Sequence, residues 1–240
     1  MRTLAVISRK GGAGKTTLST SLAVSAWRAG QKTLLVDLDP QRSAALWGRA
    51  RTMPGPAVVS ATAGKLFPVW SAAENSGCEL MILDTPAGGE DETLQAIRTA
   101  DLCVLVCRTN FFDVEALSQS IEMVRRQGKD GLVVLNQAPP RRLGQEPEAV
   151  GRAVVQLRGQ GARLADMGLR HRAGFPASAA RGLTIEETDP SGAGAREVAG
   201  VWEQVRRLLA AAHPRGGPAD RRAGWDRRAP GRLTPAAIGG

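Results

Sequence analysis

The sequence predicts an α/β fold, a doubly wound and mostly parallel sheet with helices on both faces. Short apolar runs alternate with helical patterns along most of the 240 residues. The runs are rich in Val, Ile and Leu without polar alternation, as expected for parallel strands that are covered on both faces. A glycine-rich stretch, "GGAGKTT", lies between the first apolar run and the first helical segment. In such sheets, ligands bind beyond the carboxyl ends of the strands.

The predicted elements follow one another as strand and helix. Strands are expected at 3–8, 32–38, 79–84, 101–107 and 131–136, and helices at 16–29, 43–51, 90–99, 113–127 and 146–158. The segment 163–170 is a candidate for one further strand. A closing amphipathic helix is expected at 196–212, with an apolar face made of Val198, Val201, Trp202, Val205, Leu208 and Leu209.

Two segments do not fit this alternation. In 57–77, the stretch "KLFPVW" is open to a helix, an interface patch or both, and Leu66, Phe67 and Trp70 would indicate dimer or partner contact if they were exposed. From 213 to 240 the chain is rich in Pro, Gly and Arg, which predicts a disordered basic tail after one folded domain at 1–212.

Composition and charge limit the function classes. The net charge is +9 and the isoelectric point is near 10.6, which favours acidic partners such as nucleic acid or an anionic membrane surface. Surplus arginine from a GC-rich genome is an alternative reading of that charge. Cys78, Cys103 and Cys107 show no C-x-x-C spacing and are expected to be packed thiols in a reducing compartment. No apolar stretch is long enough to span a bilayer, so a cytoplasmic protein is expected.

The glycine-rich stretch predicts a phosphate site. Backbone N–H groups of a glycine loop can surround phosphate oxygens, and the following helix N-terminus adds partial positive charge. Lys15 would reach the β- and γ-phosphates, and the hydroxyl of Thr16 would bind Mg²⁺. Arg9 stands where the usual loop has its first glycine, and a second lysine, Lys10, follows it. From the rim of the loop, Lys10 could reach phosphates bound by a second subunit.

Acidic residues end two of the predicted strands. Asp37 and Asp39 lie in "LLVDLDPQ", and Asp84 ends "LMILD". Such positions beside a phosphate loop hold Mg²⁺, and Asp39 could orient or deprotonate an attacking water. Each aspartate alone could equally be a helix cap or a turn residue. Together with the loop they predict a nucleotide hydrolysis site.

The loop resembles that of the ParA/MinD family of deviant Walker A ATPases, K-G-G-x-G-K-[ST]-T. Here it reads Lys10, Gly11, Gly12, Ala13, Gly14, Lys15, Thr16 and Thr17. The resemblance extends to "VDLDPQ" (36–41), "ILDTPAG" (82–88), "VVLNQAPPR" (133–141) and 172–198, and it is strongest toward small ParA-type partition ATPases. It covers about residues 1–212 and implies the P-loop NTPase fold of the deviant Walker A type.

The resemblance also implies roles for individual residues. Lys10 would cross an ATP-sandwich homodimer and Lys15 would bind phosphate, and both would act in catalysis with Asp39, which positions the hydrolytic water. Thr16 and Asp84, the Walker B acid, would form the Mg²⁺ site, to which the strand-end position of Asp37 adds a third residue. The nucleotide, ATP, would be bound by the whole loop from Lys10 to Thr17 and by Asn136. Asn136 would approach the adenine, although a simple strand-cap role remains an equal alternative.

The ParA-type function that follows is ATP-driven dimerisation, non-specific binding to duplex DNA and the positioning of plasmid, chromosome or other cargo. A ParB-like or cargo adaptor protein would stimulate weak intrinsic Mg²⁺-dependent hydrolysis, and the ATP form would associate with the nucleoid. The stretch 168–182 contains no acid and carries Arg170, Arg172 and Arg181 in a region that the family uses for DNA contact. A solvated basic face is the alternative.

Two other functions remain open. A MinD-like or pole-locating ATPase would act with a membrane or a protein scaffold. The last residues, "APGRLTPAAIGG", contain two prolines and several glycines and do not predict a membrane-binding helix. A metabolic ligase or an iron–sulfur electron-transfer ATPase would need a polar substrate pocket or paired loop cysteines, and the sequence indicates neither.

Overall fold

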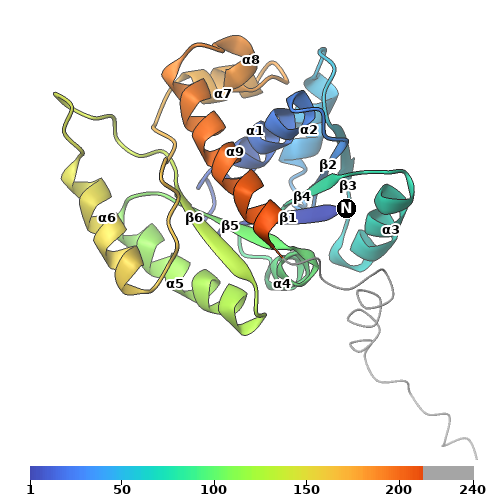
Figure 1. The fold of residues 1–240 in the computed structure, drawn as a ribbon, viewed down its shortest axis with the longest axis horizontal. Helices are drawn as coiled ribbons and strands as arrows, with labels where there is room; N and C mark the ends of the chain where they lie inside the picture. The colour runs from blue at the N-terminus through green and yellow to red at the C-terminus, as the bar shows by residue number, and fades with distance from the viewer. Residues whose placement is uncertain (213–240) are drawn as a thin grey trace, which may run out of the picture.

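Within residues 1–212, which a computed structural model describes, six parallel strands form one sheet in the order β3-β2-β4-β1-β5-β6 (Figure 1). The predicted basic tail, 213–240, lies outside the described residues. The strands are β1 (Arg2–Ile7), β2 (Thr33–Asp37), β3 (Ala57–Ser60), β4 (Leu80–Asp84), β5 (Leu102–Cys107) and β6 (Asp130–Leu135). The helices are α1 (Lys15–Arg28), α2 (Ser43–Ala50), α3 (Leu66–Asn75), α4 (Glu90–Thr99), α5 (Phe111–Arg126), α6 (Glu148–Gly159), α7 (Gly174–Ala179), α8 (Ile185–Thr188) and α9 (Ala193–Ala211).

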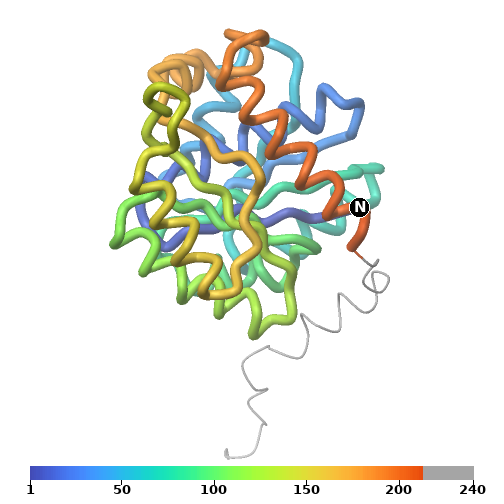
Figure 2. Tube along the Cα trace, turned by 60° about the vertical axis from the view of Figure 1, so that its left-hand side comes forward, coloured from blue at the N-terminus to red at the C-terminus, as the bar shows by residue number. Residues whose placement is uncertain are grey.

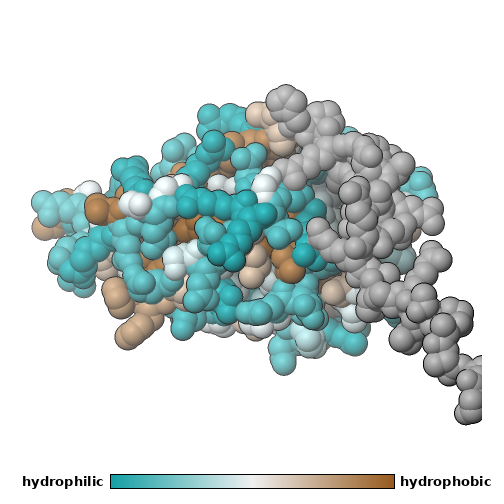
Figure 3. All heavy atoms as spheres, turned by 90° about the horizontal axis from the view of Figure 1, so that it is seen from below, coloured by the Kyte–Doolittle hydropathy of each residue, from teal (hydrophilic) through white to brown (hydrophobic). Residues whose placement is uncertain are grey.

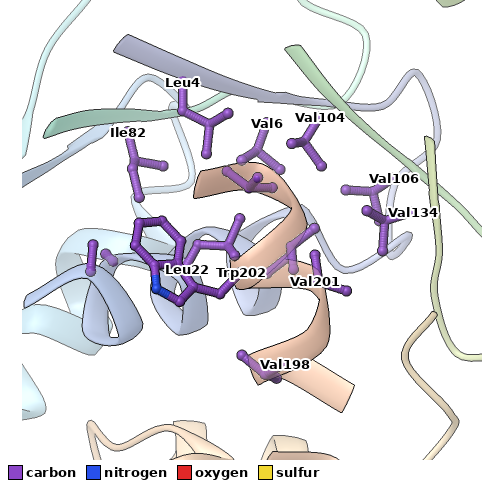
Figure 4. Close-up of a cluster of buried hydrophobic side chains, with 14 of the residues drawn as sticks. Leu4, Val6, Leu22, Ile82, Val104, Val106, Val134, Val198, Val201 and Trp202 are labelled. Atoms are coloured by element: carbon purple, nitrogen blue, oxygen red, sulfur yellow. The ribbon is translucent and has the colours of Figure 1, made fainter. Parts of the chain in front are cut away.

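Helices cover both faces of this sheet because successive strand side chains point to opposite faces. On β1, Leu4 and Val6 join a core with α1, α2, α8 and α9, whereas Ala5 and Ile7 join a second core with α3, α4, α5 and α6. In the first core, Trp202 of α9 lies with side chains of α1 and β4 (Figure 4). The predicted doubly wound fold is therefore confirmed.

The two ends of the described chain lie side by side (Figures 1 and 2). The Nη2 of Arg2, at the start of β1, donates a hydrogen bond of 2.9 Å to the carbonyl oxygen of Ala212, directly after α9. Because all strands are parallel, this junction is at the edge of the sheet opposite to the carboxyl ends of the strands.

Two segments that the sequence left open have defined structures. The segment 57–77 forms β3, a 3-10 turn and α3, and Leu66 and Trp70 are 0% and 2% exposed. Of the alternatives considered for this segment, the structure has the helix: Leu66 and Trp70 are buried and Phe67 is partly buried, because α3 turns its apolar face onto the sheet. The segment 163–170 is extended along β6, but it forms only isolated parallel bridges, at Leu164 and Arg170, in place of a regular strand.

The surface is mostly polar where it can be seen. The face in Figure 3 is largely hydrophilic, and its apolar groups are scattered over it. Among residues 1–212, no helix combines the length and the apolar character needed to cross a membrane.

Arg51, which directly follows α2, joins this helix to α8 through a buried ion pair. Its Nη2 lies 2.5 Å from Oε1 of Glu187 and its Nη1 lies 2.9 Å from Oε2, and the two side chains are only 5% and 4% exposed. The guanidinium also lies 5.2 Å from the ring centroid of Trp47. The pair fixes the end of α2, the helix in which Ala45 donates its N–H to Asp37.

Removal of Arg51 should therefore destabilise the protein. We expect Arg51→Ala to lower the free energy of unfolding by about 3 kcal/mol, because Glu187 would remain as a buried and unpaired charge. Arg152→Ala is the matched control, since Arg152 pairs with Glu148 on the exposed surface of α6; it should cost less than about 1 kcal/mol. Urea denaturation of the two variants measures both values, and equal losses would contradict the assigned role of the buried pair.

Candidate nucleotide-binding site

The topology brings the predicted site residues to one edge of the sheet. β1 lies between β4 and β5, so the loop that follows β1 lies between the residues that end those two strands. The parallel register pairs Asp37 of β2 directly with Asp84 of β4, and Asp84 with Val6 of β1. The two aspartates and the glycine loop therefore lie together, as the strand order requires.

The loop between β1 and α1 depends on two glycines and on a clamp from the end of β6. Gly12 and Gly14 have φ angles of 70° and 91°, in the left-handed region that favours glycine. Asn136 Nδ2 donates to the carbonyl oxygen of Ala13 at 2.7 Å, and Gln137 Nε2 donates to that of Gly12 at 2.9 Å. Because peptide units are planar and trans, the N–H groups of the same two peptides point away from this clamp. The loop thus presents amide donors on the side where a phosphate would bind.

Gly14 has a second reason to lack a side chain. A Cβ atom at this position would lie 2.0 Å from Nδ2 of Asn136. Asn136 is only 4% exposed, and its Oδ1 accepts the N–H of Gln137. Both polar atoms of the Asn136 side chain are therefore used by the chain itself. This geometry favours the clamp over contact with the adenine.

The two lysines of the loop differ in exposure. Lys15 opens α1 and is 7% exposed, and its Nζ donates to the carbonyl oxygen of Lys10 at 3.4 Å. Burial lowers the pKa of Lys15, and the nearby carboxylates of Asp84 and Asp39 partly offset that effect. The side chain of Lys10 is exposed at the outer rim of the loop. Only Lys15 is placed inside the site of its own chain.

Asp84 is the most deeply buried charged group of the site. Its Oδ2 accepts a hydrogen bond of 2.7 Å from Oγ1 of Thr16, and its Oδ1 accepts one of 3.0 Å from Oγ of Ser19. The side chain is 0% exposed, and desolvation by burial raises the pKa of Asp84 to about 7 despite the two hydroxyl donors. A buried carboxylate beside a threonine hydroxyl is a set of hard oxygen ligands that suits Mg²⁺.

The described residues alone do not complete a metal site. Across 1–212, no three His, Cys, Asp or Glu side chains are grouped to hold a metal ion. Mg²⁺ is commonly held through one or two carboxylates together with substrate phosphates and water. The Thr16 and Asp84 pair fits that mode of binding.

Asp37 and Asp39 have different surroundings. Asp37 is 1% exposed, and its oxygens accept backbone N–H groups of Asp39 and Ala45 at 3.0 and 2.9 Å. Burial raises the pKa of Asp37, while these backbone donors lower it. In this structure, Asp37 holds the turn that carries Asp39. Asp39 is half-buried and remains open to solvent at the mouth of the site, and it lies close enough to act electrostatically on Lys15.

The three arginines assigned to DNA contact are not equivalent. Arg170 forms a bidentate pair with Glu146 at 2.6 and 2.8 Å, and Arg172 lies 2.5 Å from Glu197. Arg181 is exposed in the turn after α7. The stretch 168–182 has no acid of its own, but distant segments bring two carboxylates to it. Its excess positive charge is thus smaller than the sequence indicates.

Several further groups lie around the site that were not predicted from the sequence. Ser19 lies one turn after Thr16 on α1, and Gln137 follows Asn136 with a φ of 51°. Phe111 and Phe112 start α5 and are 63% and 73% exposed, with their ring centroids 5.6 Å apart. Two adjacent residues at the start of a helix cannot both face the sheet. The sequence "FF" at this position could therefore have indicated an exposed aromatic side chain. Arg108, the residue after β5, carried no signal in the sequence.

Comparisons with known proteins agree with the fold and with the loop. A family description, "CobQ/CobB/MinD/ParA nucleotide binding domain", matches residues 4–185. The chain is similar to maintenance of carboxysome distribution protein A of Gloeobacter kilaueensis, with 35% identity over 151 residues that cover 62% of this chain and 68% of the relative. It is also similar to the chromosome-partitioning ATPase Soj of Thermus thermophilus, with 29% identity over 147 residues that cover 49% and 59% of the two chains. The chain thus spans less than two thirds of the second relative.

One solved structure shows the same architecture. A complex of Cyanothece McdA with ATP has a TM-score of 0.67 at 16% identity and covers 88% of this chain and 96% of the solved chain. At this identity, the likeness supports the fold and does not by itself assign a ligand to this chain.

The clamp yields a prediction that separates the two roles considered for Asn136. We expect Asn136→Ala to lower the affinity for ATP and for GTP by a similar factor of about ten, because the carbonyl of Ala13 loses its partner and the loop loses its shape. If Asn136 reads the adenine, ATP binding should fall and GTP binding should not. Isothermal titration calorimetry with both nucleotides measures the ratio. Thr184→Ala, which removes the capping box of α8, controls for general destabilisation.

Proposed function

Because the chain belongs to the CobQ/CobB/MinD/ParA nucleotide-binding family and is a ParA-type deviant Walker ATPase, we propose that it dimerises on ATP, binds duplex DNA without sequence preference and positions plasmid, chromosome or other cargo. The observation that carries the proposal is the deviant loop itself. It places Lys15 inside the site beside Asp84 and leaves Lys10 exposed at the rim. The relatives named for carboxysome distribution and chromosome partitioning support the positioning role.

The buried side of the site suits Mg²⁺-dependent hydrolysis of ATP. Thr16 and Asp84 would hold Mg²⁺, and the bound ion would neutralise charge on the β- and γ-phosphates. Lys15 would bind the same phosphates from the start of α1. Asp39 is half-buried and close enough to Lys15 to act on it electrostatically, and it would orient the attacking water. Asp37 would hold the turn that carries Asp39, and it would also contact Mg²⁺ through a water molecule.

The exposed side of the site suits a dimer. Lys10 projects from the rim, where it would reach nucleotide phosphates held by a second copy of the chain. The exposed pair Phe111 and Phe112 follows β5, the strand next to β1, and therefore lies at the same edge of the sheet. Exposed aromatic side chains are enriched in protein interfaces. The dimer would cover this pair and place Lys10 in the partner's site.

Non-specific DNA binding requires cations that are free to approach phosphates. Arg181 meets that condition, and the exposed Arg142 extends the same basic character. Arg170 and Arg172 would contribute through a local surface that Glu146 and Glu197 partly neutralise. The ATP dimer would double the number of these cations on one assembly and would associate with the nucleoid.

A second protein would complete the cycle. A ParB-like or cargo adaptor protein would bind the ATP dimer, stimulate a weak intrinsic hydrolysis and release the DNA. Residues 1–212 would form the ATPase domain of a cytoplasmic protein. In this scheme, hydrolysis switches the protein between a DNA-bound and a free state.

The proposal is tested by binding to random-sequence duplex DNA with ATP, with ADP and without nucleotide, across a salt series. Asp39→Ala should trap the ATP state and bind DNA tightly with ATP alone. Equal binding in all three states would contradict the switch. If DNA binding is absent and anionic liposomes are bound with ATP but not with ADP, the protein acts at a membrane instead.

The same assay tests the contribution of Arg181. Because each phosphate contact contributes about one to the slope of log K against log salt concentration, Arg181→Ala should reduce the magnitude of the slope by about two per dimer. Arg126→Ala is the control, since Arg126 is exposed on α5 and pairs with Glu122. An unchanged slope for Arg181→Ala would remove this arginine from the DNA contact.

Lys10→Ala should separate ATP binding from dimerisation. We expect this variant to bind ATP as a monomer and to hydrolyse it poorly, whereas Lys15→Ala should lose ATP binding. Sedimentation velocity in the presence of ATP measures the dimer, and Asp39→Ala is the positive control. Phe112→Ser should also weaken the dimer, and Val155→Ser, at a site on α6 with the same 73% exposure, should not. A normal ATP-dependent dimer of Lys10→Ala would contradict the crossing role.

A further inference from the structure

Arg108 lies beside the phosphate loop, on the side opposite to Asp84. It directly follows β5, and β5 pairs with β1 so that Leu105 is in register with Ile7, the last residue before the loop. Asp84 ends β4 on the other side of β1. The loop is therefore flanked by a buried carboxylate on one side and by a guanidinium on the other.

An ion pair fixes the guanidinium of Arg108. Its Nε lies 2.5 Å from Oδ2 of Asp113, and its Nη2 donates to Oδ1 of the same carboxylate at 3.4 Å. Asp113 is 5% exposed in the first turn of α5, and its N–H is held by Oδ1 of Asn110 at 3.0 Å. Asp113 is thus held in place, and its carboxylate sets the plane of the Arg108 guanidinium.

The third nitrogen of this group points at the loop. Nη1 of Arg108 lies 3.9 Å from the position that a Cβ atom on Gly12 would occupy, and Arg108 is 33% exposed. Within residues 1–212, Nη1 has no hydrogen-bond acceptor, while Nε and Nη2 are both used by Asp113. The carbonyl of Gly12 is already bound by Gln137. What remains open to Nη1 is the space above the loop.

Resting on the proposed function, we propose that Arg108 binds a phosphate oxygen of the nucleotide held by its own chain, through Nη1, while Asp113 positions the guanidinium. The chemistry is a charge-assisted hydrogen bond from a braced planar group, for which arginine is better suited than lysine. The ligand is a nucleoside di- or triphosphate. Arg108 would thus add a third cation to Lys15 and to Mg²⁺ without a contribution from the partner subunit.

The test measures affinity for ATP and ADP by calorimetry in Mg²⁺. It uses the Lys10→Ala background, so that loss of dimerisation does not enter the result. Arg108→Ala should weaken the binding of both nucleotides, or of ATP alone, by about tenfold. Arg108→Lys should recover part of the loss, and Asp113→Asn should lose about threefold because the guanidinium is no longer braced. Arg126→Ala, an exposed arginine on α5, should match the parent protein.

A double variant separates this role from a structural one. If Arg108 only neutralises Asp113, then Arg108→Ala combined with Asp113→Asn should restore both affinity and thermal midpoint, and the proposal is overturned. If Arg108 binds phosphate, the double variant should recover the midpoint and remain weak in affinity. Parent affinity in Arg108→Ala also overturns the proposal. Failure of the parent protein to bind ATP, or full binding by Lys15→Ala, would instead refute the proposed function.

Discussion

The site depends on one carboxylate that has no contact with solvent. An ionised group at this depth is stable only if partners replace the lost water. For Asp84, those partners are hydroxyls on the first two turns of α1, and they fix that helix against β4. With α1 and β1 both held on the sheet, the loop between them has two fixed ends and few shapes available. Between those two ends, the φ angles of Gly12 and Gly14 and the clamp from Asn136 set the shape of the loop.

The cations around the loop differ in how firmly they are held. Lys15 is buried and bound to the backbone, Arg108 is half-exposed but braced by Asp113, and Lys10 is free at the rim. Rigid groups favour one bound geometry, and a free side chain can reach across a gap. The chain thus combines two firmly held cations beside the loop with one exposed lysine at its rim, an arrangement that agrees with the proposed order of nucleotide binding before dimerisation.

The sequence was sufficient for features that are local. The strands, the major helices and the loop from Lys10 to Thr17 are contiguous patterns, and the aspartates could be placed because parallel strands share one edge. Features formed by segments that are distant in the sequence could not be predicted from it. The acid-free stretch around Arg170 meets Glu146 and Glu197 only after folding, and the clamp of Asn136 spans more than a hundred residues. β3 was missed because a four-residue edge strand with exposed side chains has little apolar pattern.

The close approach of Gly14 to Asn136 has a consequence for how this protein can change over generations. Any side chain at position 14 collides with the amide, and a smaller residue at position 136 releases the loop. Each single step is therefore harmful, and a change at both positions would remove the collision but still leave a side chain at a φ of 91°. The two positions should behave as one inherited unit with strong epistasis. Gradual change is therefore blocked at two positions that are far apart in the sequence and in contact in the fold.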